Sequence, residues 1–124
     1  MKYKSDYSLD KEAIRILRSN EWGGYTLPTQ KLYPYQWNWD SMFISLGLAQ
    51  FDINRAWLEI ESLFNSQWEN GMAAHIIFRN KAPTYFPGPE VWGTNQDPPT
   101  SGCSQPPICL LYTSPSPRDR QKAR

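Results

Sequence analysis

The part of the sequence best equipped for chemistry is residues 33–40, where four aromatic rings stand at alternate positions. The run reads Tyr-Pro-Tyr-Gln-Trp-Asn-Trp-Asp, so two amides and one carboxylate lie among the rings. A sugar offers an apolar C–H face to a ring and a rim of hydroxyls to carboxylates and amides. The run therefore suits a sugar-binding surface. The alternative is that its rings belong to the core and that Asp40 caps the helix that follows.

Residues 41–51 predict a helix that is apolar on nearly all sides. Its apolar members are Met42, Phe43, Ile44, Leu46, Leu48 and Ala49. A helix of this kind is expected to be buried on all sides. A chain of 124 residues offers few partners to bury it, so the chain is one small domain or a piece of a larger one.

Two more helices are predicted around this one. Residues 8–20 carry apolar side chains at helical spacing after a candidate N-cap, Ser8. Residues 53–69 begin after Asp52 and form a one-sided amphipathic helix, with Glu59 on another face. Its apolar face consists of Ile53, Trp57, Ile60, Leu63, Phe64 and Trp68. Because almost no linker separates the second and third helices, they should form an antiparallel hairpin, one helix fully buried and the other half-buried.

The remaining segments lack a helical period. Residues 21–36 are predicted to be a loop, and residues 72–78 to be extended or irregular. Residues 79–108 form a long Pro-rich loop that carries Tyr85 and Gln105. Loops of this length in compact domains usually bind or cover a ligand.

The composition excludes several classes of protein. Hydrophobic residues make up 40% of the chain, and no apolar run reaches the length of a membrane span. The polar N-terminus lacks an apolar signal segment, which predicts a cytoplasmic protein. A net charge of +1 gives no indication of nucleic acid or an anionic membrane as a partner. The two cysteines, Cys103 and Cys109, have no acidic residue or His between them, so we predict no disulfide framework, no metal site and no cofactor.

Residues 109–124 look foreign to the rest of the chain. Their first eleven residues, Cys-Leu-Leu-Tyr-Thr-Ser-Pro-Ser-Pro-Arg-Asp, resemble the in-frame translation of a transposase-end sequencing adaptor. We therefore expect 109–124 to be disordered and leave it out of the fold prediction. Its basic residues then give no evidence for any partner.

Three blocks rich in Trp, Pro and His follow one another in the sequence. They are Tyr-Pro-Tyr-Gln-Trp-Asn-Trp-Asp-Ser (33–41), Gly-Met-x-x-His (71–75) continuing to Tyr-Phe-Pro-Gly-Pro (85–89), and Ser-Gly-x-Ser-Gln-Pro-Pro (101–107). Together they resemble the start of bacterial mannosylglycerate and glucosylglycerate hydrolases, within glycoside hydrolase family 63. The resemblance spans residues 8–108. Cys103 and Ser104 depart from the Ile-Thr expected before Gln105.

The resemblance implies an all-α fold, the N-terminal part of an (α/α)6 barrel. Residues 1–108 would supply a first helix, about one helical hairpin and the long Pro-rich loop of a truncated barrel. The expected reaction is hydrolysis of a glycosidic bond with inversion, on a small α-glucoside or α-mannoside such as glucosylglycerate or mannosylglycerate. The catalytic acid and base would lie beyond the end of this chain, which would leave it inactive.

The same resemblance implies which residues contact the substrate. Trp39 and Asp40 would hold the sugar, with His75 reaching the same pocket. Tyr33, Tyr85 and Gln105 would line the mouth, where the glycerate end lies. Trp37 and Trp92 are assigned to packing, and the oligomeric state stays open.

Two other functions remain as alternatives. One is a non-catalytic carbohydrate-binding module that uses Trp39, Tyr85 and Trp92 as a platform. The module would have to bury the apolar helix 41–51 with no second helix of comparable apolarity, which counts against it. The other is a trehalase-like or glucoamylase-like barrel enzyme, which the Tyr-Phe-Pro-Gly-Pro block disfavours.

Overall fold

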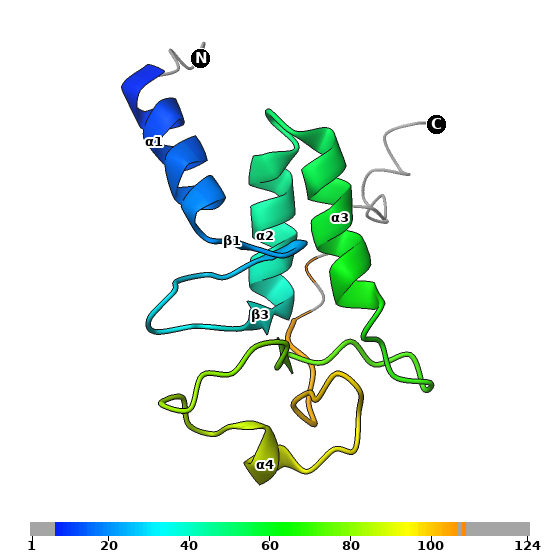
Figure 1. Ribbon diagram of the computed structural model, residues 1–124. Coiled ribbons are helices and arrows are strands. Elements are labelled where there is room, and N and C mark those ends of the chain that lie inside the picture. The colour runs from blue at the N-terminus through cyan, green and yellow to red at the C-terminus, as the bar shows by residue number, and fades with distance from the viewer. Residues whose placement is uncertain (1–6, 107, 109–124) are drawn as a thin grey trace, which may run out of the picture.

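The computed structural model describes residues 7–106 and residue 108 (Figure 1). The segment expected to derive from an adaptor, 109–124, lies outside the described residues. The elements in chain order are α1 (Tyr7–Ser19), β1 (Glu21–Trp22), β2 (Tyr25–Thr26), β3 (Gln36–Trp37), α2 (Asn38–Leu48), α3 (Ile53–Phe64), β4 (Ile76–Ile77) and α4 (Pro89–Trp92). The fold is therefore helical with a few two-residue strands rather than purely α.

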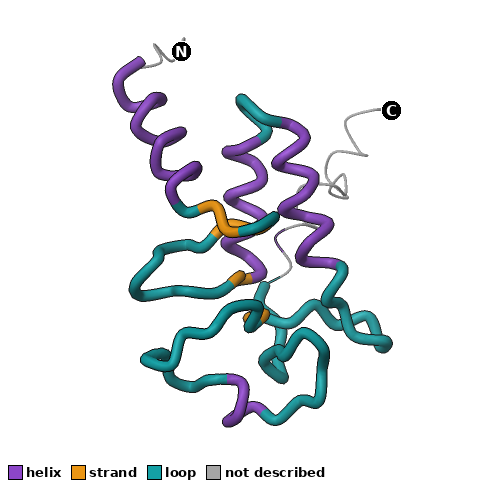
Figure 2. The backbone as a smooth tube through the Cα atoms, viewed as in Figure 1, coloured by secondary structure: helices purple, strands orange, loops and turns teal. Residues whose placement is uncertain are grey.

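Helices α2 and α3 form the predicted antiparallel hairpin and lie side by side at the centre of the molecule (Figures 1 and 2). Asp52 starts α3 as its N-cap, because its Oδ1 accepts a hydrogen bond from the Arg55 backbone N–H at 3.0 Å. The backbone N–H of Asp52 also donates to the Leu48 carbonyl at 2.7 Å, which closes the turn between the helices. Helix α1 begins at Tyr7, so Ser8 lies inside it and is not its N-cap.

The segments predicted to be loops contain more order than expected. Residues 21–36 include the hairpin of β1 and β2, turned by Gly23 and Gly24 at φ +60° and +104°. Positive φ at both positions is typical of a tight hairpin turn, and it is a geometry that glycine adopts without strain. The Pro-rich loop includes α4, which has Pro89 in its first turn and ends at the left-handed Gly93. The extended or irregular conformation predicted for 72–78 is confirmed, because the segment contains no helix and its residues Ile76–Ile77 form β4, which pairs with β3.

Helix α2 is not buried on all sides, contrary to the prediction. Its buried residues are Asn38, Ser41, Met42, Ser45 and Leu48. Phe43 is 55% exposed and Trp39 is 41% exposed. The reason is that α2 packs mainly on α3 with one face, and this face carries the two serines.

The predicted buried face of α3 is also wrong in part. Ile53, Trp57 and Phe64 are exposed, whereas Leu63 is buried as expected. The buried face consists of Arg55, Ala56, Glu59 and Leu63. It can include two charged residues because Glu59 accepts hydrogen bonds from Thr26 and Ser41, and Arg55 Nε donates to Glu21. Within the described part of the chain, Arg55 Nη1 has no hydrogen-bond partner.

Helix α3 ends at Phe64 rather than at residue 69. The backbone N–H groups of Ser66 and Gln67 donate to the carbonyls of Leu63 and Phe64, a tighter turn than that of an α-helix. The chain then reverses at Gly71, whose φ is +87°.

The apolar core lies at the base of the hairpin, where β3 meets β4. One cluster joins Tyr35, Trp37, Ile76 and Phe78, and a second joins Met42, Leu63 and Ile77. The first cluster holds β3 through Trp37, the second joins α2, α3 and β4, and β3 leads directly into the first turn of α2. Within residues 7–106 and 108, no helix has the length and apolarity needed to cross a membrane.

Candidate functional site

Four of the six predicted contact residues line one cavity of about 330 Å³: Tyr33, Trp39, Asp40 and Gln105, with Trp37 as the fifth lining residue. Tyr33 precedes β3, and Trp39 and Asp40 lie in the first turn of α2. Gln105 comes from the end of the Pro-rich loop, far away in sequence. The cavity therefore combines aromatic rings, an amide and a carboxylate, which are the groups that a sugar needs.

Asp40 lies within the first turn of α2 and is not its N-cap. Helix α2 begins at Asn38, because the backbone N–H of Asn38 donates to the His75 carbonyl at 3.0 Å, where β3 gives way to the helix. Burial raises the pKa of the Asp40 carboxyl, and hydrogen bonds from its own backbone N–H and from the Trp39 side chain oppose this rise. A carboxylate in the first helical turn is also favoured by the helix dipole. Asp40 is thus not the N-cap residue, but its carboxyl still accepts from one first-turn backbone N–H, its own.

Gln105 supplies the missing cap from a distance. The N-cap residue of α2, Trp37, makes no side-chain capping bond. The Gln105 Oε1 instead accepts a hydrogen bond from the Trp39 backbone N–H at 3.0 Å. Gln105 thereby ties the Pro-rich loop to the turn that carries Asp40.

Trp37 belongs both to the cavity wall and to the core. It is only 6% exposed, which confirms its predicted packing role. The ring of Tyr33 meets it edge to face at 5.3 Å between centroids. Tyr33 itself is half-exposed at the mouth of the cavity.

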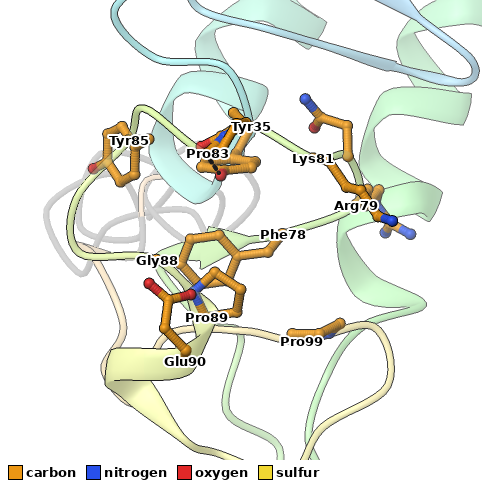
Figure 3. Close-up of a pocket in the computed structure, with 12 residues that line it drawn as sticks. Tyr35, Phe78, Arg79, Lys81, Pro83, Tyr85, Gly88, Pro89, Glu90 and Pro99 are labelled. Carbon is orange, nitrogen blue, oxygen red and sulfur yellow. Dashed lines mark hydrogen bonds between the residues drawn. The ribbon is translucent and has the colours of Figure 1, made fainter.

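Tyr85 lies on the far side of the same aromatic group and does not line this cavity. Its ring packs edge to face on Trp37 at 5.5 Å and on Tyr35 at 5.3 Å. It lines a second cavity, of about 500 Å³. Figure 3 shows the residues that line this second cavity, with Tyr35 and Phe78 in the middle of the view, Tyr85 on one side and Arg79 and Lys81 on the other.

His75 is close to the start of α2 in the backbone, but its ring is held elsewhere. Its Nδ1 lies 2.7 Å from the Ser101 Oγ and 3.4 Å from the Cys103 Sγ. The ring meets Trp92 edge to face at 5.8 Å. Burial lowers the pKa of His75, so the imidazole is neutral at neutral pH, with one ring nitrogen donating and the other accepting.

A buried polar network behind the cavity was missed from the sequence. Glu59, which was placed on an outer face, is 0% exposed. Its Oε1 accepts a hydrogen bond from the Ser41 hydroxyl at 2.6 Å, and its Oε2 accepts from the Thr26 hydroxyl at 2.8 Å and from Arg55 Nη2 at 2.9 Å. The one available signal was the spacing of Arg55 and Glu59, four residues apart on one helix face.

Metal binding finds no support in this part of the chain. Among the residues that the structure describes, no group of three or more His, Cys, Asp or Glu side chains is arranged to hold a metal ion.

The chain matches known proteins over most of its length. The family model of the mannosylglycerate hydrolase MGH1-like glycoside hydrolase domain matches residues 33–113. Mannosylglycerate hydrolase MGH1 of Selaginella moellendorffii is 53% identical over 102 residues, which are 81% of this chain and 21% of that protein. The glucosylglycerate hydrolase of Mycolicibacterium hassiacum is 40% identical over 107 residues, which are 81% of this chain and 24% of that protein.

Solved structures agree with these matches. The crystal structure of the family 63 mannosylglycerate hydrolase from Thermus thermophilus in complex with Tris superposes with a TM-score of 0.78 at 45% identity. The alignment covers 93% of this chain and 29% of that one. The same enzyme in complex with glucose gives a TM-score of 0.66. The chain thus spans less than a third of the length of each of these relatives, and it belongs to the mannosylglycerate hydrolase MGH1-like glycoside hydrolase family.

Proposed function

We propose that the full-length protein containing this chain is an inverting glycoside hydrolase that acts on a small α-mannoside or α-glucoside, such as mannosylglycerate or glucosylglycerate. The observation that carries the proposal is the cavity in which Tyr33, Trp39, Asp40 and Gln105 meet. Relatives named as mannosylglycerate and glucosylglycerate hydrolases support the substrate class.

Each lining residue has a task that follows from its chemistry. Trp39, which is partly exposed, offers a ring face to the C–H side of the sugar. The Asp40 carboxylate accepts hydrogen bonds from sugar hydroxyls, and each such charge-assisted bond is worth about 1.5–3 kcal/mol. Tyr33 and the Gln105 amide nitrogen complete the mouth. His75 and Tyr85 lie outside the wall of this cavity, so the proposal assigns them no contact with the sugar there.

Inverting hydrolysis needs a carboxylic acid at the leaving oxygen and a carboxylate that activates water on the opposite face, roughly 6.5–9.5 Å apart. We assign both groups to parts of the full-length protein outside this chain. The hairpin of α2 and α3 would then be one inner and outer helix pair of an (α/α)6 barrel. The task of the present residues is to bind and orient the sugar, with Asp40 ionised.

The test is kinetic and uses the full-length protein. Asp40→Asn should lower kcat/KM for mannosylglycerate or glucosylglycerate by about a hundredfold, because a buried carboxylate contact to the reacting sugar is lost. Glu90→Gln is the matched control, since Glu90 lines the second cavity and should leave kcat/KM unchanged. NMR of the first-formed product anomer checks inversion. If the unmodified protein hydrolyses neither glycoside, the proposed activity is wrong.

A further inference from the structure

The two residues that flank the cavity-lining turn are both bound to helix α3. Ser41 follows Asp40, and its hydroxyl donates to Glu59 Oε1 at 2.6 Å. Gln36 precedes Trp37, and its Nε2 donates to the Ser62 Oγ at 2.8 Å and to the Ser41 Oγ at 3.2 Å. Gln36 and Ser41 are both 0% exposed. Residues 37–40 therefore span two fixed points on the same neighbouring helix.

The carboxylate of Glu59 is itself held in one orientation. Its second oxygen accepts from the Thr26 hydroxyl at 2.8 Å and from Arg55 Nη2 at 2.9 Å. Arg55 is buried as well, and its Nε donates to Glu21 Oε1 at 2.8 Å. Bonds on both oxygens leave the group no freedom to rotate, so Oε1 is a rigid acceptor for Ser41.

The amide of Gln36 is fixed in the same way from the other side. Its Oε1 accepts a hydrogen bond from Arg79 Nε at 3.0 Å. Arg79 also donates to the Ser66 hydroxyl at 2.7 Å and to the Ser62 carbonyl. The Gln36 amide nitrogen must then point at Ser62 and Ser41.

Neither Glu59 nor Ser41 lines the cavity, so neither can touch a sugar there. A buried charge pair is often no more stable than apolar packing in its place. The bond between Ser41 and the Glu59 carboxylate supplies a fully buried anchor one residue away from Asp40. Displacements of about 1 Å in binding groups can cost about a hundredfold in rate.

We propose that Glu59 and Ser41 are positioning residues for the sugar site, which hold Trp39 and Asp40 at the geometry that the substrate requires. The proposal rests on the proposed hydrolase function for the meaning of "substrate". The anchoring of residues 37–40 by Glu59 and Ser41 does not depend on the hydrolase function.

The experiment compares two substitutions in the full-length protein, each of which removes one hydroxyl donor to the same carboxylate. Each hydroxyl also accepts one hydrogen bond, Ser41 from Gln36 Nε2 at 3.2 Å and Thr26 from Arg55 Nη2 at 2.8 Å, so each substitution removes two bonds. Ser41→Ala removes the bond on the cavity side, and Thr26→Val removes a bond on the far side. Both variants should lose thermal stability. Only Ser41→Ala should lower kcat/KM for mannosylglycerate or glucosylglycerate, by about tenfold and mainly through KM. Thr26→Val should stay within about twofold of the unmodified protein, because Arg55 Nη2 still holds Glu59 Oε2 at 2.9 Å and the carboxylate keeps its orientation.

Hydrogen–deuterium exchange gives a readout that does not depend on activity. Ser41→Ala should speed exchange in the peptide that spans residues 37–41, and Thr26→Val should not. Ser62→Ala, at a half-buried position, should act in the same direction as Ser41→Ala and decides the question if Ser41→Ala does not fold.

The outcomes separate the two claims. Equal effects of Ser41→Ala and Thr26→Val on both kcat/KM and local exchange would overturn the positioning role while leaving the hydrolase proposal in place. An unmodified protein that hydrolyses neither glycoside would overturn the hydrolase proposal, and the exchange data would then decide on the anchor alone.

Discussion

Asp40 is the residue on which the sugar-site hypothesis depends most. It is half-buried next to Trp39, and burial raises the pKa of its carboxyl above the ordinary value for Asp. A site that needs the ionised form should therefore lose affinity for sugar at a higher pH than an exposed Asp would allow. Glucose titrations of the full-length protein at decreasing pH measure this directly. A titration midpoint at or below the ordinary Asp range would contradict it.

The same shift makes a prediction about stability. Because the folded-state pKa of Asp40 is raised, the folded protein holds this proton more tightly than the unfolded chain does. The free energy of unfolding contributed by Asp40 is then largest below the unfolded-state pKa and falls as pH rises through the folded-state pKa. Asp40→Asn removes that cost, so its Tm at neutral pH should equal or exceed that of the unmodified protein. A clearly lower Tm would show that Asp40 is mainly structural.

Replacing Glu59 should lower thermal stability, in contrast to replacing Asp40. Removing Glu59 leaves the buried Arg55 with only the partly exposed Glu21 as counter-charge, and it deprives the Ser41 and Thr26 hydroxyls of their acceptor. Breaking a buried ion pair by removing one partner costs about 3–5 kcal/mol. Glu59→Ala should therefore lower the thermal stability of the full-length protein strongly. Glu61→Ala on the same helix is the matched control, since its exposed side chain should change stability by about 0.5 kcal/mol or less. Calorimetry of the two variants tests the contrast, and similar melting curves would contradict it.

At the scale of elements, the start of α2 depends on a residue 66 positions away from Trp39. Gln105 caps the Trp39 N–H, since Trp37 makes no side-chain capping bond. Gln105→Ala should cost about 0.5–2 kcal/mol of stability and should weaken sugar binding as well. Gln105→Glu keeps the acceptor for the N–H but loses the amide donor. We therefore expect Gln105→Glu to preserve Tm and still reduce affinity for the glycoside. If Gln105→Ala and Gln105→Glu both lose Tm and affinity together, Gln105 has no binding role separate from its capping role.

The helices could be predicted because their signals are local. Asp52 before an apolar period of three and four residues is enough to place α3 next to α2, and the hairpin follows from the short link. The strands β1 and β2 had a usable signal as well, the Gly23-Gly24 pair, which was interpreted only as a break.

The orientation of α3 could not be predicted in the same way. An apolar side chain such as Trp57 is assumed to point inward, and a carboxylate such as Glu59 outward, because burying a charge without partners is expensive. The hydrogen-bond partners of Glu59, Thr26 and Ser41, come from other elements and produce no periodic pattern in the sequence. The bond between Gln105 and Trp39 was invisible for the same reason, although both residues had been assigned to the site.

For the molecule as a whole, the exposed apolar side chains are the main consequence of this packing. They include Phe43 on α2 and Ile53, Trp57 and Leu58 on α3. Exposed apolar side chains in this number promote association. The 124-residue polypeptide on its own should self-associate and bind a hydrophobic dye, as gel filtration and dye fluorescence would show. A monomer with a well-dispersed NMR spectrum and measurable affinity for a glycoside would instead favour a free-standing binding module.

The likeness to family 63 structures extends over nearly the whole chain, so the cavity lies in a framework that its relatives share. The second cavity, lined by Tyr85, is the alternative location for a sugar, and the contact between the Trp37 and Tyr85 rings separates it from the cavity at Asp40. The most direct measurement is a crystal structure of the full-length protein soaked with its glycoside or with glucose. We predict a sugar ring against Trp39, with its hydroxyls within hydrogen-bond distance of the Asp40 carboxylate. A sugar bound in the second cavity, between Phe78 and Pro89, with nothing at Asp40, would contradict it.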